Sequence, residues 1–118
     1  MKEIFGYELI MDVPGCDLSI MSSKRKLEEY ADSLCRLVGM KKYGKTQLPY
    51  FGANELYTKG YSMLQFIETS SITGHFSEYW KKAYINLFSC KEYDHLSVVD
   101  FTKTFFKSND IKYKLLVR

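Results

Sequence analysis

Ile67-Glu68-Thr69-Ser70-Ser71-Ile72-Thr73-Gly74-His75 is the segment from which we predict the fold, together with Phe88-Ser89-Cys90 at the end of the next strand-like run. The two segments contain a hydroxyl at Ser70, an imidazole at His75 and a thiol at Cys90. A hydroxyl can attack its own backbone, and an imidazole or a thiol can transfer protons near neutral pH. Their combination favours a site of self-cleavage, although none of the three is diagnostic alone.

Each of these features also has a purely structural explanation. Thr69-Ser70-Ser71 taken alone is typical of a polar turn, and a single His75 is more often a surface or core histidine. Cys90 at the end of a strand is usually a small buried apolar residue. The aromatic segment from Tyr50 to Tyr61 would ordinarily belong to a core or an interface. The spacing of Ser70, His75 and Cys90 along the chain is what favours a self-cleavage site over these structural explanations.

In this spacing the chain resembles the prokaryotic S-adenosylmethionine decarboxylase proenzyme family, of which it looks like a divergent member. Family members open with a strand that ends in Gly-Cys-Asp, and Gly15-Cys16-Asp17 has this form. Their processing segment reads Glu-Ser-His-(Ile/Leu)-Ser-Ile-His, and residues 69–75 fall on it without a gap. Continuing ungapped, the family's Phe-Thr-Cys falls on residues 88–90, and its auxiliary serine falls on Ser62.

The resemblance implies self-cleavage between Thr69 and Ser70, which would split the chain into residues 1–69 and 70–118. Ser70 would attack the Thr69 carbonyl and become a pyruvoyl group, the cofactor of this family. By the same resemblance, Ser62 and Thr73 would stabilise the intermediate, and His75 would abstract a proton from Ser70.

A pyruvoyl carbonyl serves as a covalent electron sink for decarboxylation of an amino acid. Cys90 is the predicted donor of the proton that replaces the carboxylate, because a thiol is mostly protonated at neutral pH yet gives up its proton readily. The resemblance implies that S-adenosylmethionine is the substrate and that its product is the aminopropyl donor for polyamine synthesis.

Binding of S-adenosylmethionine requires aromatic rings against adenine and a carboxylate against the ribose hydroxyls. Phe51 and Phe76, with Tyr50, are the predicted stacking residues, and Glu78 is the predicted ribose ligand. The ungapped frame places Tyr79 on the family's glutamate, so the assignment to Glu78 requires a one-residue shift in the loop.

Three departures from the family pattern leave alternatives open. Thr69 replaces the usual glutamate, Ser71 replaces the first histidine, and the Trp-Pro that follows the second histidine is Phe76-Ser77 or is shifted. One alternative is the same mechanism on a basic amino acid, ornithine or arginine, as in some members of the family. Another is an unprocessed homologue that binds a ligand or a partner without decarboxylation. A basic substrate would require carboxylates in the pocket, for which the sequence offers Glu55, Glu68 and Glu78.

Length and composition indicate one globular domain spanning residues 1–118. The net charge of +3 is interspersed along the chain and is too small to favour nucleic acid. No stretch approaches the roughly 20 apolar residues of a membrane helix, so we expect a soluble cytoplasmic protein without membrane contacts. Cys16, Cys35 and Cys90 are too widely spaced for a disulfide framework or for paired metal ligands, and no metal site is predicted.

The pattern of apolar and turn residues predicts alternating strands and helices. The order favours an α+β fold, a two-layer sandwich of a mostly antiparallel sheet with two helices on one face. Such a sheet leaves its other face uncovered, and the family resemblance implies a homodimer with catalytic residues from both protomers. Strands are predicted at residues 3–13, within 46–60, and at 61–69, 83–90 and 111–117. One helix is predicted from Ser22 or Ser23 to Met40, with Gly44 closing that unit, and a second from Asp94 to Lys107.

Overall fold

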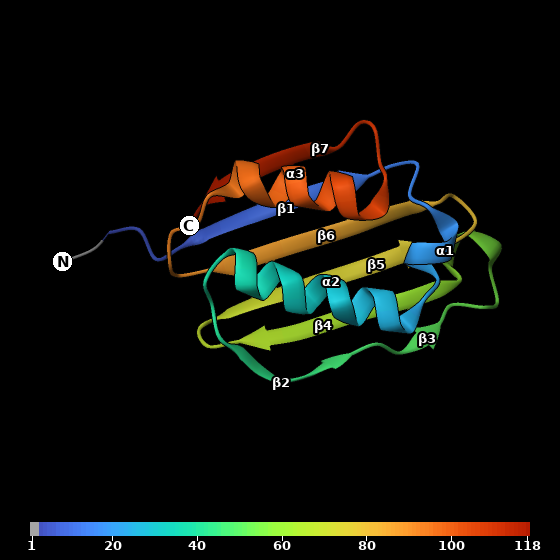
Figure 1. Cartoon of the computed structure of the whole chain (residues 1–118), viewed down its shortest axis with the longest axis horizontal. Coiled ribbons are helices and arrows are strands. Elements are labelled where there is room, and N and C mark those ends of the chain that lie inside the picture. Colours follow the sequence, from blue (N-terminus) through green and yellow to red (C-terminus); the bar gives the residue numbers. More distant parts are fainter. Residues whose placement is uncertain (1–2) are drawn as a thin grey trace.

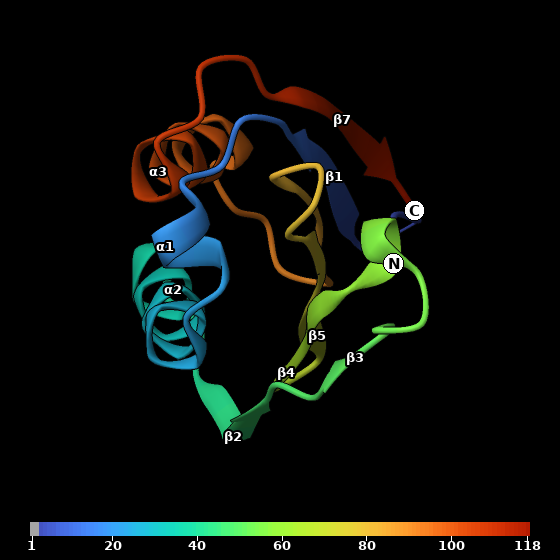
Figure 2. The same ribbon diagram turned by 90° about the vertical axis from the view of Figure 1, so that its right-hand side faces the viewer.

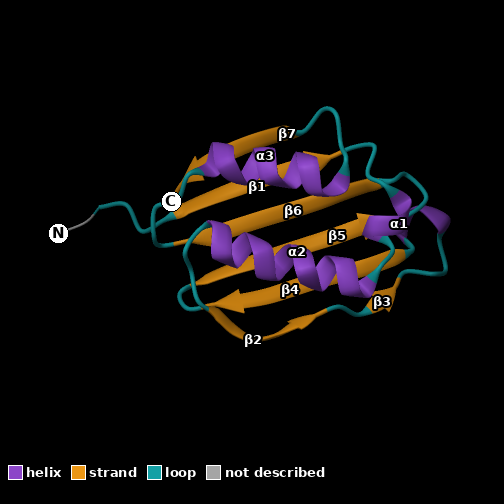
Figure 3. Cartoon of the chain, in the orientation of Figure 1, coloured by secondary structure: helices purple, strands orange, loops and turns teal. Residues whose placement is uncertain are grey.

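The computed structural model describes residues 3–118 and shows a seven-stranded antiparallel sheet with helices on one face (Figures 1 and 3). The spatial order of the strands is β2-β4-β5-β6-β1-β7, and β3 also pairs with β4. The predicted α+β two-layer sandwich is therefore confirmed. The elements in chain order are β1 (Tyr7–Val13), α1 (Leu18–Met21), α2 (Lys24–Leu37), β2 (Lys42–Gln47), β3 (Tyr50–Phe51), the 3-10 turn η1 (Leu56–Thr58), β4 (Gly60–Ile67), β5 (Ser70–Ser77), β6 (Lys82–Ser89), α3 (His95–Phe106) and β7 (Lys112–Val117).

The two faces of the sheet differ in what covers them. Figure 2 shows α1, α2 and α3 together on one side of the sheet, which we call the helix face. Alternate residues of each central strand point there; in β6 they are Ala83, Ile85 and Leu87, all fully buried. The residues between them point to the opposite, open face, as expected for an antiparallel sheet covered on one side. No helix of residues 3–118 is long and apolar enough to cross a membrane.

Helix α2 begins and ends at residues whose chemistry explains its limits. The Ser23 side chain accepts a hydrogen bond from the Lys26 amide, as an N-cap does. Gly39 follows the helix in a left-handed conformation, φ 67°, where glycine carries no steric penalty. The prediction that Gly44 closes this unit was wrong, because Gly44 lies inside β2 at an irregularity in its pairing with β4.

Helix α3 confirms the predicted helix that follows Asp94, whose side chain accepts a hydrogen bond from the Ser97 amide. The helix packs against α2 through a fully buried polar contact. The Tyr30 hydroxyl and Thr102 Oγ1 lie 2.7 Å apart, and the Tyr30 ring lies 5.0 Å from that of Phe106. Each buried hydroxyl is thereby satisfied, which makes the polar pair tolerable in an apolar core.

Four elements were not predicted from the sequence: α1, β5, the turn η1 and most of β2. Helix α1 has only four residues, and its N-cap is Asp17. Strand β5 contains Gly74 and several serines, which weaken the strand pattern. The segment forms a strand because it is hydrogen-bonded to β4 on one side and to β6 on the other.

Candidate functional site

The β4–β5 hairpin contains the predicted cleavage point. Ile67 pairs with Ser70, so Glu68 and Thr69 are the two central residues of the turn. Thr69 has φ 62°, a left-handed conformation that costs a β-branched residue about 1–3 kcal/mol. Hairpin turns of this length usually place glycine or asparagine at such positions. The backbone is therefore strained beside the bond that the sequence predicts to be cut.

The Thr69 hydroxyl is held between two groups. It donates a hydrogen bond to the Glu68 carbonyl oxygen at 2.5 Å and accepts one from the Cys90 thiol at 3.1 Å. Cys90 follows the last residue of β6 and is half-buried. Two predicted residues that are 21 positions apart in the sequence are thus in contact across the end of the sheet.

Ser70 begins β5 and points to the helix face, where it is 9% exposed. Its hydroxyl donates to Ser89 Oγ at 2.7 Å, and Ser89 is the residue directly opposite on β6. Ser89 is fully buried and also accepts a hydrogen bond from the Lys91 amide at 2.9 Å. We call Glu68, Thr69, Ser70, Ser89 and Cys90 the hairpin cluster.

The hairpin cluster borders a cavity of about 340 Å³. Two lysines and one glutamate contribute charged side chains to its wall. The cavity is lined by Gly39, Met40, Lys41, Glu68, Thr69, Ser70 and Lys91.

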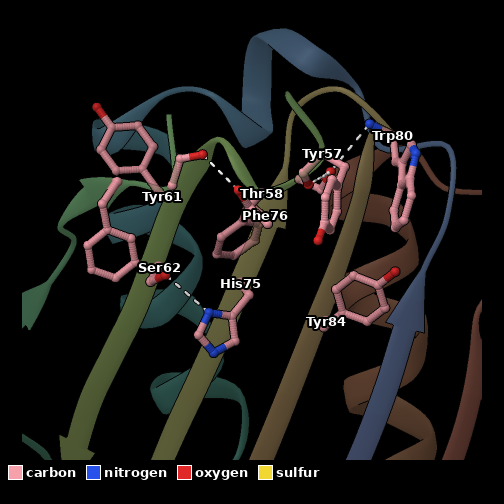
Figure 4. A pocket seen from close by; sticks show the side chains of 11 residues that line it. Tyr57, Thr58, Tyr61, Ser62, His75, Phe76, Trp80 and Tyr84 are labelled. Atoms are coloured by element: carbon pink, nitrogen blue, oxygen red, sulfur yellow. Dashed lines mark hydrogen bonds between the residues drawn. The ribbon is translucent and has the colours of Figure 1, made fainter. Parts of the chain in front are cut away.

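His75 and Ser62 lie on the opposite face of the sheet. They are cross-strand neighbours on β5 and β4, and Ser62 Oγ lies 3.0 Å from His75 Nδ1 (Figure 4). Thr73, two residues before His75 on β5, is on the same face and half-buried. The imidazole is exposed, and only one of its ring nitrogens has a hydrogen bond drawn in Figure 4.

The structure does not bring Ser70 and His75 together within one chain. They are five residues apart on one strand, which corresponds to about 16 Å at ~3.3 Å per residue. They also point to opposite faces, because side chains alternate along a strand. Within a single chain, the structure therefore does not place His75 where it could take a proton from Ser70.

A second cavity, of about 390 Å³, surrounds His75 on the open face. Its walls are mostly aromatic, and we call it the aromatic pocket (Figure 4). The Tyr57 and Trp80 rings lie together on one side of it, with their centroids 5.4 Å apart. The pocket is lined by Phe51, Gly52, Tyr57, Thr58, Tyr61, Ser62, His75, Phe76, Ser77, Trp80 and Tyr84.

The predicted substrate-binding residues occupy different parts of this region. Phe51 is exposed and lines the aromatic pocket. Phe76 also lines it, but its ring is 2% exposed and packs in the core 5.8 Å from Phe106. Glu78 lies outside the lining and accepts a hydrogen bond from the Tyr50 hydroxyl at 3.1 Å. Desolvation, followed by this hydrogen bond to a carboxylate, raises the pKa of Tyr50.

Sequence reasoning missed several residues that the structure places at these two sites. The sequence prediction assigns no role to Ser89, although its alternation with Ile85 and Leu87 in β6 indicates that it faces the core. Trp80 is the only tryptophan of the chain, and tryptophans with exposed faces are common in binding sites. Tyr57 lies in the aromatic segment from Tyr50 to Tyr61, which the sequence pattern assigns to a core or an interface, and Tyr84 carried no comparable signal.

Comparisons with known proteins agree on the fold. Residues 7–118 match a family model described as S-adenosylmethionine decarboxylase. Among solved structures, the adenosylmethionine decarboxylase from Aquifex aeolicus VF5 superposes with a TM-score of 0.82. The alignment covers 99% of this chain and 92% of that one at 14% sequence identity, so it supports the fold alone. No match was found among curated proteins.

Proposed function

Because the chain belongs to the S-adenosylmethionine decarboxylase family, we propose that it is a self-processing decarboxylase of S-adenosylmethionine that serves polyamine synthesis. The contact between Cys90 and Thr69 carries this proposal. It joins the thiol that the family frame assigns to proton donation with the turn that the same frame assigns to cleavage. A purely structural turn would not require a strained threonine with a thiol against its hydroxyl.

The residues of the hairpin cluster suit the formation of a pyruvoyl group. The turn offers adjacent hydroxyls, one carbonyl within hydrogen-bond distance of a hydroxyl, and backbone strain that cleavage would release. The sequence frame assigns the attacking hydroxyl to Ser70. A pyruvoyl group at this position would supply the electron sink for decarboxylation. Cys90 lies beside the turn and would hold the proton that the product receives.

The aromatic pocket supports S-adenosylmethionine over a basic amino acid. Phe51, Tyr57 and Trp80 offer ring faces for adenine, and aromatic faces also attract a cationic sulfonium. Among the described residues, none that lines this pocket carries a carboxylate, whereas ornithine or arginine would require one. Glu78 is held by Tyr50 near the pocket and remains the proposed ligand of the ribose hydroxyls.

The separation of the two sites supports a homodimer with shared active sites. One chain presents the hairpin cluster and the aromatic pocket at opposite ends of β5. A second copy that runs antiparallel to the first would place its His75 and aromatic pocket near the first copy's turn. The open face also exposes apolar rings, including Phe66 and Tyr43, which a second sheet would cover.

The test of this function combines mass and turnover. We expect the purified chain to separate into two fragments at the β4–β5 hairpin, and the cleaved protein to release CO₂ from carboxyl-labelled S-adenosylmethionine. Ornithine and arginine are assayed in parallel and should release none. An intact chain after prolonged incubation would contradict self-processing, and release from ornithine or arginine alone would contradict the substrate.

A further inference from the structure

The two hydroxyls of the hairpin point at different groups. Ser70 Oγ is directed into the helix face and bonds to Ser89 Oγ at 2.7 Å. Thr69 Oγ1 lies 2.5 Å from the Glu68 carbonyl oxygen, which belongs to the peptide bond immediately preceding it. An acyl shift from nitrogen to oxygen requires a hydroxyl beside the carbonyl of the preceding residue. The structure places the Thr69 hydroxyl within hydrogen-bond distance of that carbonyl.

We propose that Thr69, and not Ser70, is the attacking residue, so that the chain is cut between Glu68 and Thr69. The inference rests on the self-processing proposed above, but it changes which peptide bond is cut and which group forms at the new N-terminus. The cleaved chains are then residues 1–68 and 69–118. The second chain begins with a 2-oxobutanoyl group in place of pyruvoyl.

The turn geometry separates the two candidate bonds. The Glu68–Thr69 peptide is the central one of the turn and lies outside the β-ladder. Ser70 is already part of β5 and pairs with Ile67 on one side and Ser89 on the other. The left-handed strain also resides at Thr69, and cutting the bond before it frees its φ angle.

The contacts of Thr69 hold its hydroxyl in the attacking position. The Cys90 thiol donates to Thr69 Oγ1 at 3.1 Å, while the hydroxyl proton already points to the Glu68 carbonyl oxygen. Cys90 thus fixes the rotamer that keeps Oγ1 beside the carbonyl. The neighbouring residue Ser70 is 9% exposed, and its hydroxyl would have to leave Ser89 before it attacked.

The covalent steps balance with water as the only co-reactant. Thr69 Oγ1 bonds to the Glu68 carbonyl carbon while its proton passes to the carbonyl oxygen. The carbon–nitrogen bond then breaks, the proton moves to the nitrogen, and an ester remains. Loss of the Thr69 Cα proton expels Glu68 as a carboxylate and leaves a dehydrobutyrine. Its enamine tautomerises to an imine, which takes up water and releases ammonia, so no oxidant or reductant is needed.

The intact mass of the purified wild-type protein tests this assignment directly. We expect fragments 1–68 and 69–118, and borohydride reduction followed by acid hydrolysis should yield 2-hydroxybutyrate. Fragments 1–69 and 70–118, with lactate after reduction, would overturn the inference while leaving self-processing in place. A chain that stays whole would overturn both.

Matched variants identify the nucleophile independently. Thr69→Ala and Thr69→Gly should remain uncut, and Thr69→Ser should restore cleavage at the same bond with lactate as the reduction product. Ser70→Ala should still give residues 1–68 and 69–118. Thermal unfolding of each variant shows that it is folded, and Thr69→Gly keeps the left-handed turn without strain. Cleavage in Thr69→Gly together with its loss in Ser70→Ala would overturn the inference.

Discussion

Thr69 shows how much of the site depends on one backbone angle. A β-branched residue at φ 62° is uncommon, and the angle follows from a two-residue turn that contains neither glycine nor asparagine. The sequence shows adjacent hydroxyls at positions 69 and 70 but not which of them lies beside a carbonyl. Rotamers and turn geometry determine that, and the Thr69 hydroxyl also accepts a tertiary hydrogen bond from Cys90.

Trp80 is the residue at which substrate binding can be tested most simply. Its ring lines the aromatic pocket and is 54% exposed. We expect Trp80→Ala to raise the KM for S-adenosylmethionine roughly 5- to 100-fold, since stacking of a base on an aromatic ring contributes about 1–3 kcal/mol. Steady-state kinetics of the processed enzyme measure the change.

Tyr79 provides the matched control for Trp80. It is the preceding residue in the same turn, is 62% exposed, and does not line the pocket. Tyr79→Ala should therefore leave KM near its wild-type value. Equal increases in both variants would show that the turn, and not the Trp80 ring, determines binding.

Cys16 is a residue whose ionisation is coupled to folding. Its side chain is 2% exposed, and burial raises the pKa of its thiol to about 12. Because the folded pKa exceeds the unfolded one, the resulting stabilisation is complete below about pH 8.5 and is lost as the pH rises towards 12. We expect the free energy of unfolding to fall over this range, and to fall less steeply in Cys16→Ala.

Urea unfolding at about pH 8, 10 and 11 measures that slope. Tyr93 contributes in the same direction, because burial raises the pKa of its hydroxyl to about 12. Tyr93→Phe is therefore the matched variant, and the double variant should show the flattest dependence on pH. Parallel curves for Cys16→Ala and wild type would show that this thiol does not drive alkaline destabilisation.

Strand β2 is bound to β4 through a single buried side chain at its irregularity. Gln65 of β4 is fully buried, and its Nε2 donates to the carbonyl oxygens of Tyr43 and Gly44 at 3.3 and 3.2 Å. Its Oε1 accepts from Thr46 Oγ1 at 2.5 Å. These bonds satisfy the backbone where the β2–β4 register shifts.

We expect Gln65→Ala to destabilise the fold by about 2–4 kcal/mol, since it leaves buried polar groups unpaired and creates a cavity. The midpoint of urea unfolding measures the loss. Gln47→Ala, at an exposed position of β2, is the control and should change stability by less than about 0.5 kcal/mol. A small effect at Gln65 would mean that water replaces its hydrogen bonds.

Most elements were predictable because their limits are local. Ser23 and Asp94 cap α2 and α3, and capping residues are recognisable without tertiary information. Strand β5 was not predictable in this way, because its extended conformation depends on hydrogen bonds to two neighbouring strands. Gly44 misled the prediction for the opposite reason, since a glycine suited to a helix end is equally suited to an irregular strand.

At the scale of the whole molecule, the arrangement of active sites is the main prediction. Alternation along β5 determines that Ser70 and His75 face opposite sides of the sheet, and this could have been deduced once β5 was recognised as a strand. Co-expression of two variants tests whether a second copy completes the site. One carries His75→Ala, and the other carries both Thr69→Ala and Ser70→Ala, so that neither hairpin hydroxyl remains.

Each variant alone should stay whole, the first because it lacks the imidazole and the second because it lacks a nucleophile. In the mixture we expect cleavage of the His75→Ala chain only, with the imidazole supplied by its partner. The different masses of the chains identify which one is cut. If both chains are folded and associated but neither is cut in the mixture, shared active sites would be contradicted. If the His75→Ala variant is cut when expressed by itself, the imidazole takes no part in processing.

The distance along β5 between the hairpin hydroxyls and the imidazole has a consequence for how the protein matures. If His75 is the base, a newly synthesised monomer does not sever itself, since its own imidazole lies five residues beyond Ser70 along the strand. If a partner supplies the base, the initial rate of maturation rises with the square of the concentration of unassociated chains. Dilute protein then persists as an inert precursor, and the amount of active enzyme depends on a threshold of synthesis.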